Sequence, residues 1–430
     1  MNISKLDQNL SIFSITLDNY QELNQQLKQV IEEHRELYPE TNNSNVKAWH
    51  SNWESHKDNP KFKLIVDKVL ELCEVVSLEY FNQKIQFECS NMWAIQYEKG
   101  EYAVKHSHYP SDFACVYYVD VELGCSPIIF EEELEVLPQN GMLLIFPANL
   151  QHEVPPTDST RIVISMNVDR IGSRNMDVVK MDNNVSIKPI SVPNSEGDQK
   201  VFLDQQLHEF LSNDLSSILN SYDKNVEEDS TDVDQILEIY NIIESSDINL
   251  TEENILNFLQ IENRWPYQYF KDTENPRQGP SSIYGFETPI QVIVKENVVE
   301  RNSFYDRTGK FIFDEWKKYY DLGFTTMISN VLDLTPELRK LRSKIFNIIG
   351  INVEGNFYLT NGGKKVHSSW LPHKHHYNAI VKMIYGDTKW KISDDIIDYS
   401  GGDTILIPSE TYHSVVECPN KRLSLTINLF

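Results

Sequence analysis

The chain has 430 residues, of which 40% are hydrophobic and 11% aromatic, enough apolar material for two or three folded domains. Its formal net charge of -25 at pH 7 repels phosphate backbones and disfavours broad nucleic-acid binding. The cysteines are odd in number and include no Cys-x-x-Cys pair, which fits a reducing compartment. Because the sequence shows neither a signal peptide nor a membrane-spanning apolar run, we expect a cytoplasmic protein without a membrane partner.

The first part of the chain changes from helical to strand-like patterning near residue 87. Residues 18–38 and 60–84 place apolar side chains at steps of three and four, which predicts two amphipathic helices. Beyond them, short runs rich in Val, Ile, Tyr and Phe are broken by Gly, Pro and Asn, as is typical of strands. The clearest predicted strands are 91–98, 113–120, 142–146 and 161–167.

The second part repeats this change after a polar segment. Residues 170–200 contain glycines and prolines and predict a linker. Strand-like patterning returns from about residue 281 and continues to the C-terminus, interrupted by two helices. The predicted helices of this part are 201–221, 235–244, 251–262, 312–320 and 335–349. We therefore expect a domain at 1–170, a linker and helical segment at 171–280, and a second domain at 281–430.

Two segments of the chain share one ordered set of residues. Each has a His-x-His, then Gly, Pro, His and Val at identical offsets, an arginine nine residues after the later histidine, and an asparagine six residues beyond the arginine. From the glycine onward the two sets lie 261 residues apart. A repeat of this length indicates duplicated domains and not a solenoid. The first set is His106, His108, Gly141, Pro147, His152, Val154, Arg161 and Asn167; the second is His373, His375, Gly402, Pro408, His413, Val415, Arg422 and Asn428.

The histidines of each set form a candidate metal site. On an extended strand the side chains of a His-x-His point to one face, and a third histidine from a distant strand can complete a triad. Three ligands on one face leave positions open for a co-substrate and O2. Imidazole suits iron, zinc, copper and nickel, so the triad alone does not select iron. A lone histidine is more often an ordinary core or surface residue, but the duplication favours metal ligands.

Arg161 and Arg422 each begin an apolar run, RIVISMN and RLSLTIN. A guanidinium is costly to bury without a partner, and its planar fork can hold a carboxylate bidentately. We therefore predict that each arginine holds the far carboxylate of 2-oxoglutarate, whose keto acid end would chelate the metal. The alternative is a permanent Asp or Glu partner. In the second domain Lys389 and Lys391 are further candidates for the carboxylate.

Residues 48–168 resemble a family of 2-oxoglutarate–Fe(II) oxygenases found in marine bacteria and their phages. The residues that carry the resemblance are Trp93, His106, His108, Pro110, Tyr117, Tyr118, Gly141, Phe146, Pro147, His152, Arg161 and Asn167. More distantly, Tyr97 and Gly100 ahead of His106 are similar to a motif of prolyl 4-hydroxylases. The resemblance implies Fe(II), 2-oxoglutarate and O2 as cofactors, with Tyr97, Arg161 and Asn167 at the cofactor site; core packing is the other interpretation of Tyr97.

Residues 357–430 are similar to the catalytic cores of JmjC-type and cupin-type oxygenases. The matching residues are His373, His375, Gly386, Trp390, Gly402, Asp403, Pro408 and His413. By the repeat, Arg422 and Asn428 are the counterparts of Arg161 and Asn167, and we expect them at the cofactor site of the second domain. The two resemblances together predict a mainly β fold with helices (α+β), in which a helical segment joins two double-stranded β-helix (jelly-roll, cupin-like) domains.

Both sets depart from these families at one ligand, because a histidine stands where the usual triad has a carboxylate. Asp112 is an alternative ligand in the first domain, and His376 is a spare histidine in the second. The leading hypothesis is a dioxygenase that hydroxylates a protein side chain, prolyl by distant analogy, or a small molecule. The alternatives are a three-histidine bicupin enzyme that does not use 2-oxoglutarate and a non-catalytic binding or structural module.

Overall fold

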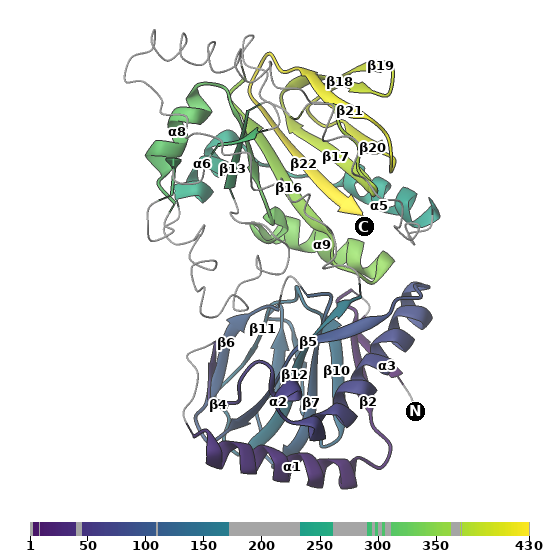
Figure 1. The fold of residues 1–430 in the computed structure, drawn as a ribbon, viewed down its shortest axis with the longest axis vertical. Helices are drawn as coiled ribbons and strands as arrows, with labels where there is room; N and C mark the ends of the chain where they lie inside the picture. The colour runs from purple at the N-terminus through teal and green to yellow at the C-terminus, as the bar shows by residue number, and fades with distance from the viewer. Residues whose placement is uncertain are drawn as a thin grey trace.

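A computed structural model describes residues 3–7, 9–39, 45–108, 111–171, 233–260, 290–294, 297–299, 303–305, 311–362, 370 and 372–429. Most of the predicted linker and the predicted helix 201–221 lie outside the described residues. The fold is mixed α+β and mostly sheet. It contains two pairs of facing sheets, one built from the N-terminal part of the chain and one from the C-terminal part, which are stacked along the long axis of the molecule (Figure 1). We call them the first and the second sheet pair.

The first sheet pair is formed by β1 (Ile3–Asp7), β2 (Ile12–Thr16), β3 (Val46–Lys47), β4 (Trp49–His50), β5 (Phe87–Tyr97), β6 (Tyr102–His106), β7 (Phe113–Val121), β8 (Ile128–Phe130), β9 (Leu134–Val136), β10 (Met142–Pro147), β11 (His152–Val154) and β12 (Arg161–Arg170). The larger sheet has the order β1-β2-β10-β7-β12-β5-β4, and the smaller has the order β3-β6-β11-β8-β9. The predicted strands 91–98, 113–120, 142–146 and 161–167 are all present. The hairpin of β1 and β2 was not predicted.

Alternation along β12 shows how this pair is packed. Ile162 and Ile164 belong to the outer core beneath the helices α1 (Tyr20–Leu37) and α3 (Lys63–Phe81), whereas Val163 belongs to the core between the two sheets. Both helices were predicted from their apolar spacing. A short helix α2 (Ser55–Asp58) and a 3-10 turn η1 (Pro60–Phe62) connect β4 to α3. Arg161, two residues before Val163, therefore faces the space between the sheets.

The second sheet pair is formed by β13 (Ile290–Val294), β14 (Asn297–Val298), β15 (Thr325–Ile328), β16 (Glu354–Thr360), β17 (Asn378–Tyr385), β18 (Asp387–Ile392), β19 (Asp395–Ser400), β20 (Thr404–Ile407), β21 (His413–Glu417) and β22 (Arg422–Leu429). Its larger sheet has the order β14-β13-β15-β16-β22-β17-β20 and faces a sheet of order β19-β18-β21. The outer core lies beneath α5 (Val233–Ser245), α6 (Glu252–Gln260), α8 (Phe313–Asp321), η6 (Val331–Asp333) and α9 (Pro336–Ile349). These α-helices match the predictions at 235–244, 251–262, 312–320 and 335–349.

Strand pairing reproduces the sequence repeat. In the first pair β12 lies between β5 and β7, and β7 pairs with β10; in the second, β22 lies between β16 and β17, and β17 pairs with β20. His152 is the register partner of His106, and His413 is the partner of His373. The glycines that open β10 and β20, Gly141 and Gly402, both have positive φ angles, of 78° and 98°. Glycine adopts such angles without the penalty that a Cβ brings, which suits these turns.

The two sheet pairs meet at α9 and the segment that follows it (Figure 1). The ring of Phe346 lies edge-on to Phe81 and to Phe113, with centroid distances of 5.7 Å in both cases. The side-chain amide of Asn352 donates to the carbonyl oxygens of Ser111 (2.5 Å) and Asp112 (3.2 Å). Part of the first core is thus supplied by the C-terminal part of the chain.

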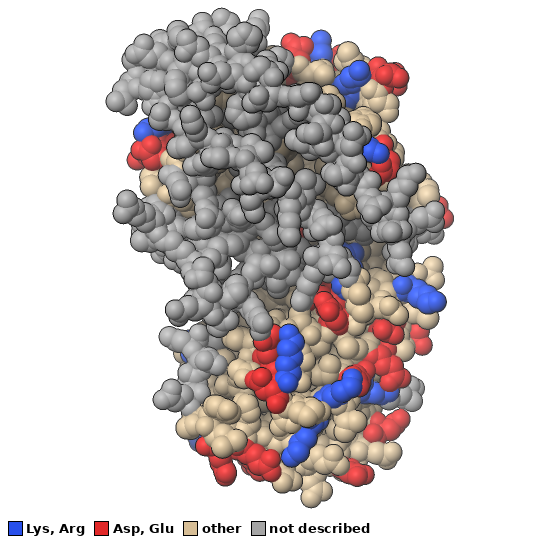
Figure 2. All heavy atoms as spheres, viewed as in Figure 1, with Lys and Arg blue, Asp and Glu red and all other residues tan. Residues whose placement is uncertain are grey.

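The described surface is electrostatically mixed. Lys28 lies 2.6 Å from Asp120, and Arg35 lies 3.0 Å from Glu98. Figure 2 shows basic and acidic side chains next to one another over the first sheet pair on the face in view. Among the described helices, none is both long enough and apolar enough to cross a membrane.

Candidate metal centres

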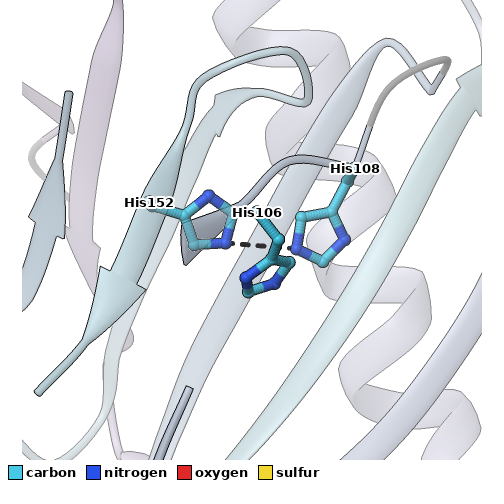
Figure 3. Close-up of side chains that lie close together, drawn as sticks. All are labelled: His106, His108 and His152. Atoms are coloured by element: carbon cyan, nitrogen blue, oxygen red, sulfur yellow. Dashed lines mark hydrogen bonds between the residues drawn. The ribbon is translucent and has the colours of Figure 1, made fainter. Parts of the chain in front are cut away.

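The first centre brings together the three histidines that the sequence predicted for the N-terminal domain. His106 ends β6, His152 begins β11, and His108 lies just beyond β6 (Figure 3). One ring nitrogen from each lies within 4.8 Å of the others. Nε2 of His108 is 3.2 Å from Nε2 of His152. The prediction that His-x-His shares one strand face was wrong in its local detail, because the strand ends at His106 and the amide of His108 donates to Ala148 instead.

Hydrogen bonds at Nδ1 orient these rings. Nδ1 of His106 lies 2.7 Å from the carbonyl of Val104, and Nδ1 of His152 lies 3.0 Å from the carbonyl of Leu150. Nδ1 of His108 lies 2.8 Å from Oδ1 of Asn167. Carbonyl oxygens only accept, so Nδ1 carries the proton and Nε2 keeps a free lone pair. Fixing the tautomer in this way is how proteins prepare histidine for a metal.

The spacing suits an ion held between the rings. Nitrogens at about 2.1 Å from one ion, with angles between octahedral and tetrahedral, lie about 3.0–3.4 Å apart. The observed 3.2 Å between His108 and His152 falls in this range. Without an ion, two lone pairs would face each other there. Burial, followed by the neighbouring His106, lowers the pKa of His108 to about 3, and burial lowers the pKa of His106 and His152 as well. All three are neutral at pH 7, the form that binds metal.

The second centre has nearly the same shape. Ring centroids of His373, His375 and His413 are separated by 4.8, 4.4 and 5.0 Å, against 5.1, 4.4 and 5.0 Å for the corresponding pairs of the first centre. Their ring nitrogens also lie within 4.8 Å of one another. Nδ1 of His413 lies 2.9 Å from the carbonyl of Thr411. Burial, followed by His373 and His413, lowers the pKa of His375 to about 3.

Arg161 is buried on the inner wall of the first pair, with 2% of its surface exposed. Its guanidinium lies 4.6 Å from the ring centre of Tyr97 and donates one hydrogen bond, from Nη1 to the carbonyl of Ser126 (3.0 Å). Its Nε and the hydroxyl of Tyr118 are buried and have no hydrogen-bond partner among the residues that the structure describes. Two donors therefore face the space between the sheets without an acceptor.

Arg422 lies at the corresponding place in the second pair and is also 2% exposed. Its Nε and Nη1 are buried without a partner, and burial lowers the pKa of this guanidinium. Among the described residues, neither Arg161 nor Arg422 forms an ion pair with a carboxylate. The alternative of a permanent Asp or Glu partner thus has no support in the described part of the chain.

The alternative ligands and anchors lie elsewhere. The carboxylate of Asp112 accepts hydrogen bonds from the amides of Arg170 (2.9 Å) and Asn352 (3.4 Å), and this residue belongs to neither histidine cluster. His376 packs against Tyr377, with centroids 5.3 Å apart, and is not in the second cluster either. Lys389 is half-exposed and ion-pairs with Glu417. Lys391 lies two positions further along β18, on the same outward face as Lys389, and is also exposed.

Three inner-wall features were not assigned to the site from the sequence. Trp93 stacks on His108 with centroids 5.6 Å apart, and Tyr377 stacks on His375 at 4.6 Å. Glu354, buried at the start of β16, is the register partner of Asn428. Trp93 belongs to the family motif, which gave it no role at the centre. Tyr377 lies two residues after His375, and this spacing was the signal that could have found it. Glu354 carries no local signal, because only the pairing of β16 with β22 brings it to the wall.

No protein-family model and no curated protein matches the sequence. Among solved structures, the chain is similar to the viral collagen prolyl hydroxylase of Paramecium Bursaria Chlorella virus-1 in its 2OG complex (15% identity, 36% of this chain and 94% of that one, TM-score 0.28). It is also similar to a prolyl-4-hydroxylase of Pseudomonas putida (13% identity, 37% and 93%, TM-score 0.31). A cupin 2 conserved barrel domain protein of Rhodopseudomonas palustris matches at 18% identity (18% and 51%, TM-score 0.16). The function proposed below rests on the chain's own residues.

Proposed function

We propose that this protein is an Fe(II)- and 2-oxoglutarate-dependent dioxygenase built from two double-stranded β-helix domains, residues 1–170 and 281–430. The observation that carries the proposal is the same in both sheet pairs: a buried arginine that has no carboxylate partner among the described residues accompanies a cluster of three histidines. A dicarboxylate that reaches from the metal to the arginine would supply the missing acceptors. Fe(II), 2-oxoglutarate and O2 together supply oxidative hydroxylation of an unactivated C–H bond.

The protein's own residues bind, orient and exclude water in this proposal. His106, His108 and His152 would hold the first ion, and His373, His375 and His413 the second. Arg161 would bind the distal carboxylate between the sheets of the first pair, with Tyr97 beneath its guanidinium and the Tyr118 hydroxyl as a further donor. Arg422 would do the same in the second pair. Asn167 holds the ring of His108, so we assign it to ligand orientation and not to direct contact with the cofactor; Asn428 takes the corresponding wall position.

The set of metal ligands also supports the alternative of a three-histidine enzyme that does not use 2-oxoglutarate. Among the described residues no carboxylate joins either histidine cluster, so these ligands leave a bound divalent ion its full charge of +2. Three-histidine centres of this kind occur in cupin enzymes that do not use 2-oxoglutarate, and one of the two centres here could be of that kind. A dianionic 2-oxoglutarate would neutralise the ion, which is why we prefer the first proposal. The substrate that we expect is a protein side chain, or a small molecule.

The test is anaerobic titration of the full chain with Fe(II) and then 2-oxoglutarate. The proposal expects a weak visible charge-transfer band when both are present, followed by succinate formation when O2 is admitted. Zn(II) in place of Fe(II) is the control, because it fills a histidine site without redox chemistry. If Fe(II) binds and 2-oxoglutarate produces neither a band nor succinate, the three-histidine alternative replaces the proposal.

A further inference from the structure

The inner walls of the two sheet pairs can be compared position by position through their strand registers. Arg161 is the partner of Tyr97 on β5, and Arg422 is the partner of Thr360 on β16, so these strands take the same place in the two pairs. Along this strand the first wall presents Asn91, Trp93, Ile95 and Tyr97, and the second presents Glu354, Asn356, Tyr358 and Thr360. The wall of the first pair is thus largely apolar along this strand, whereas the wall of the second pair is polar.

The polar side chains of β16 face the space between the sheets. Phe357 and Leu359 belong to the outer core beneath the helices, so the residues that alternate with them point the other way. Asn356 is opposite Thr426, and Thr426 is opposite Val381, which belongs to the inner core. Side chains of directly paired residues lie on one face of a sheet.

A second observation places Glu354 on the side of the histidines. Tyr377 stacks on His375 with centroids 4.6 Å apart. Glu354 is the register partner of Asn428, and Asn428 is the partner of Ala379, which belongs to the inner core and lies four residues after His375. Asn428 takes the wall position of Asn167, whose side chain holds the ring of His108 in the first pair. Glu354 therefore lies at the end of the inner wall where β17 follows the histidines of the second centre.

Two acceptors on this wall have no donor within the described part of the chain. Glu354 is 9% exposed, and none of the described residues donates a hydrogen bond to it. Oδ1 of Asn356 is buried without a partner. Burial raises the pKa of Glu354 and the charge of Arg170 opposes the rise, but the backbone amide and Nε of Arg170 face Asp112 at 2.9 and 3.9 Å. A buried acceptor left without a donor costs about 1–3 kcal/mol, so the wall is suited to a ligand that donates.

We propose that the second sheet pair binds a ligand with a cationic hydrogen-bond donor, an ammonium or guanidinium group, between Glu354 and Asn356 beside the second histidine cluster. The first sheet pair has Asn91 and Trp93 at the corresponding positions, and without a carboxylate there it takes an uncharged group. The inference that this ligand is a substrate rests on the proposed function. Binding of the ligand can be measured without any turnover. The two centres then act on chemically different ligands.

The test compares two probes of similar shape, n-butylammonium and 1-butanol, on the Zn(II)-loaded full chain at about pH 8. Ligand-observed NMR gives a dissociation constant for each probe. The cation should bind about tenfold or more tightly than the alcohol, since a hydrogen bond to a charged group contributes about 1.5–3 kcal/mol. Glu354→Gln should remove the preference, and Asn356→Asp should increase it. Glu417→Gln, which removes an exposed carboxylate of the same sheet pair, is the matched control and should leave the preference unchanged.

Equal affinity for the two probes, or a preference that survives Glu354→Gln, overturns the inference. If Glu354→Gln does not fold, Asn356→Asp decides: an unchanged preference in that variant also overturns it. Succinate formation is measured on the Fe(II)-loaded parent in parallel. A parent that prefers the cation but never turns over 2-oxoglutarate would refute the proposed function and leave the binding site standing.

Discussion

His108 of the first sheet pair stacks on Trp93, whereas at the place of that tryptophan the second pair has Asn356, and its own His375 stacks on Tyr377. Both pairs have a histidine cluster, a buried arginine, and an asparagine that pairs with the inner strand, which is β5 in the first pair and β16 in the second. The two pairs differ mainly in the other side chains of this inner strand. The two sheet pairs therefore share the groups suited to a metal and a carboxylate and differ in the groups that a substrate would meet. If this is right, the two centres bind a metal and a carboxylate in the same way and differ in the side chains that surround a substrate.

The largest expected effect is the loss of one ion. His152→Ala and His413→Ala should each abolish metal binding at one centre and leave the other intact, because the two clusters share no residue. Co(II) titration followed by its visible spectrum measures the number of sites. Parent protein should bind two ions, each single variant one, and the double variant none. A single variant that loses both ions would show that the centres depend on each other.

The next effect concerns the arginines. Arg161→Ala and Arg422→Ala should each weaken 2-oxoglutarate binding at their own centre by ~2–5 kcal/mol, the range for truncating one member of a buried charge pair. Metal binding should change little, because the ligands lie on other strands. Binding is measured by anaerobic calorimetry with Fe(II) present, using the His413→Ala or His152→Ala background to isolate one centre. An effect at only one centre would identify the other as the one that does not use 2-oxoglutarate.

A smaller effect follows from the buried carboxylate of the second wall. Burial raises the pKa of Glu354 from 4.5 to about 7, although Arg170 opposes the rise, while Tyr358 and Tyr377 stay neutral there. The folded state then holds a proton that the unfolded state has lost, so stability is full below pH 4.5 and falls as the pH rises towards 7. The loss reaches at most about 3 kcal/mol.

Urea unfolding of the metal-free protein at several pH values measures this contribution. Glu354→Gln should remove it, so the variant should be more stable than the parent at about pH 8 and not at pH 4.5. Asn91→Ala, at the corresponding wall position of the first pair, should leave the pH dependence as it is. An identical pH dependence in parent and Glu354→Gln would mean that the carboxylate is not desolvated.

The sequence predicted the histidine clusters and the arginines because their offsets recur, and it predicted a strand at 161–167 because RIVISMN is a short run rich in Val and Ile. It missed the hairpin of β1 and β2, whose first strand, ISKLD, has only two apolar residues among polar ones. It also missed Glu354 and Asn356. These residues flank a glycine in a run that resembles a loop, and only the pairing of β16 with β22 brings them to the inner wall.

The smallest effect tests whether the first centre stands alone. Asn352, from the C-terminal part of the chain, donates to the carbonyls of Ser111 and Asp112, and its amide donates to the Asp112 carboxylate. The carbonyl of Asp112 also accepts from Ala148, whose own carbonyl accepts from the amide of His108. The segment of His108 and the segment of Ala148, which leads to His152, are therefore both linked through Asp112 to the second sheet pair.

Asn352→Ala should cost about 1–3 kcal/mol of stability, since it leaves buried carbonyls without a donor. It should also weaken Co(II) binding at the first centre, measured in the His413→Ala background. Asn347→Ala is the matched control: Asn347 also crosses the junction, but it contacts Asn9 and Ser11, away from the ligand segments. Equal Co(II) affinity in the two variants would mean that the junction only holds the sheet pairs together. A weaker affinity in Asn352→Ala alone would mean that the second pair helps to position the ligands of the first, so that the first domain expressed alone would bind metal poorly.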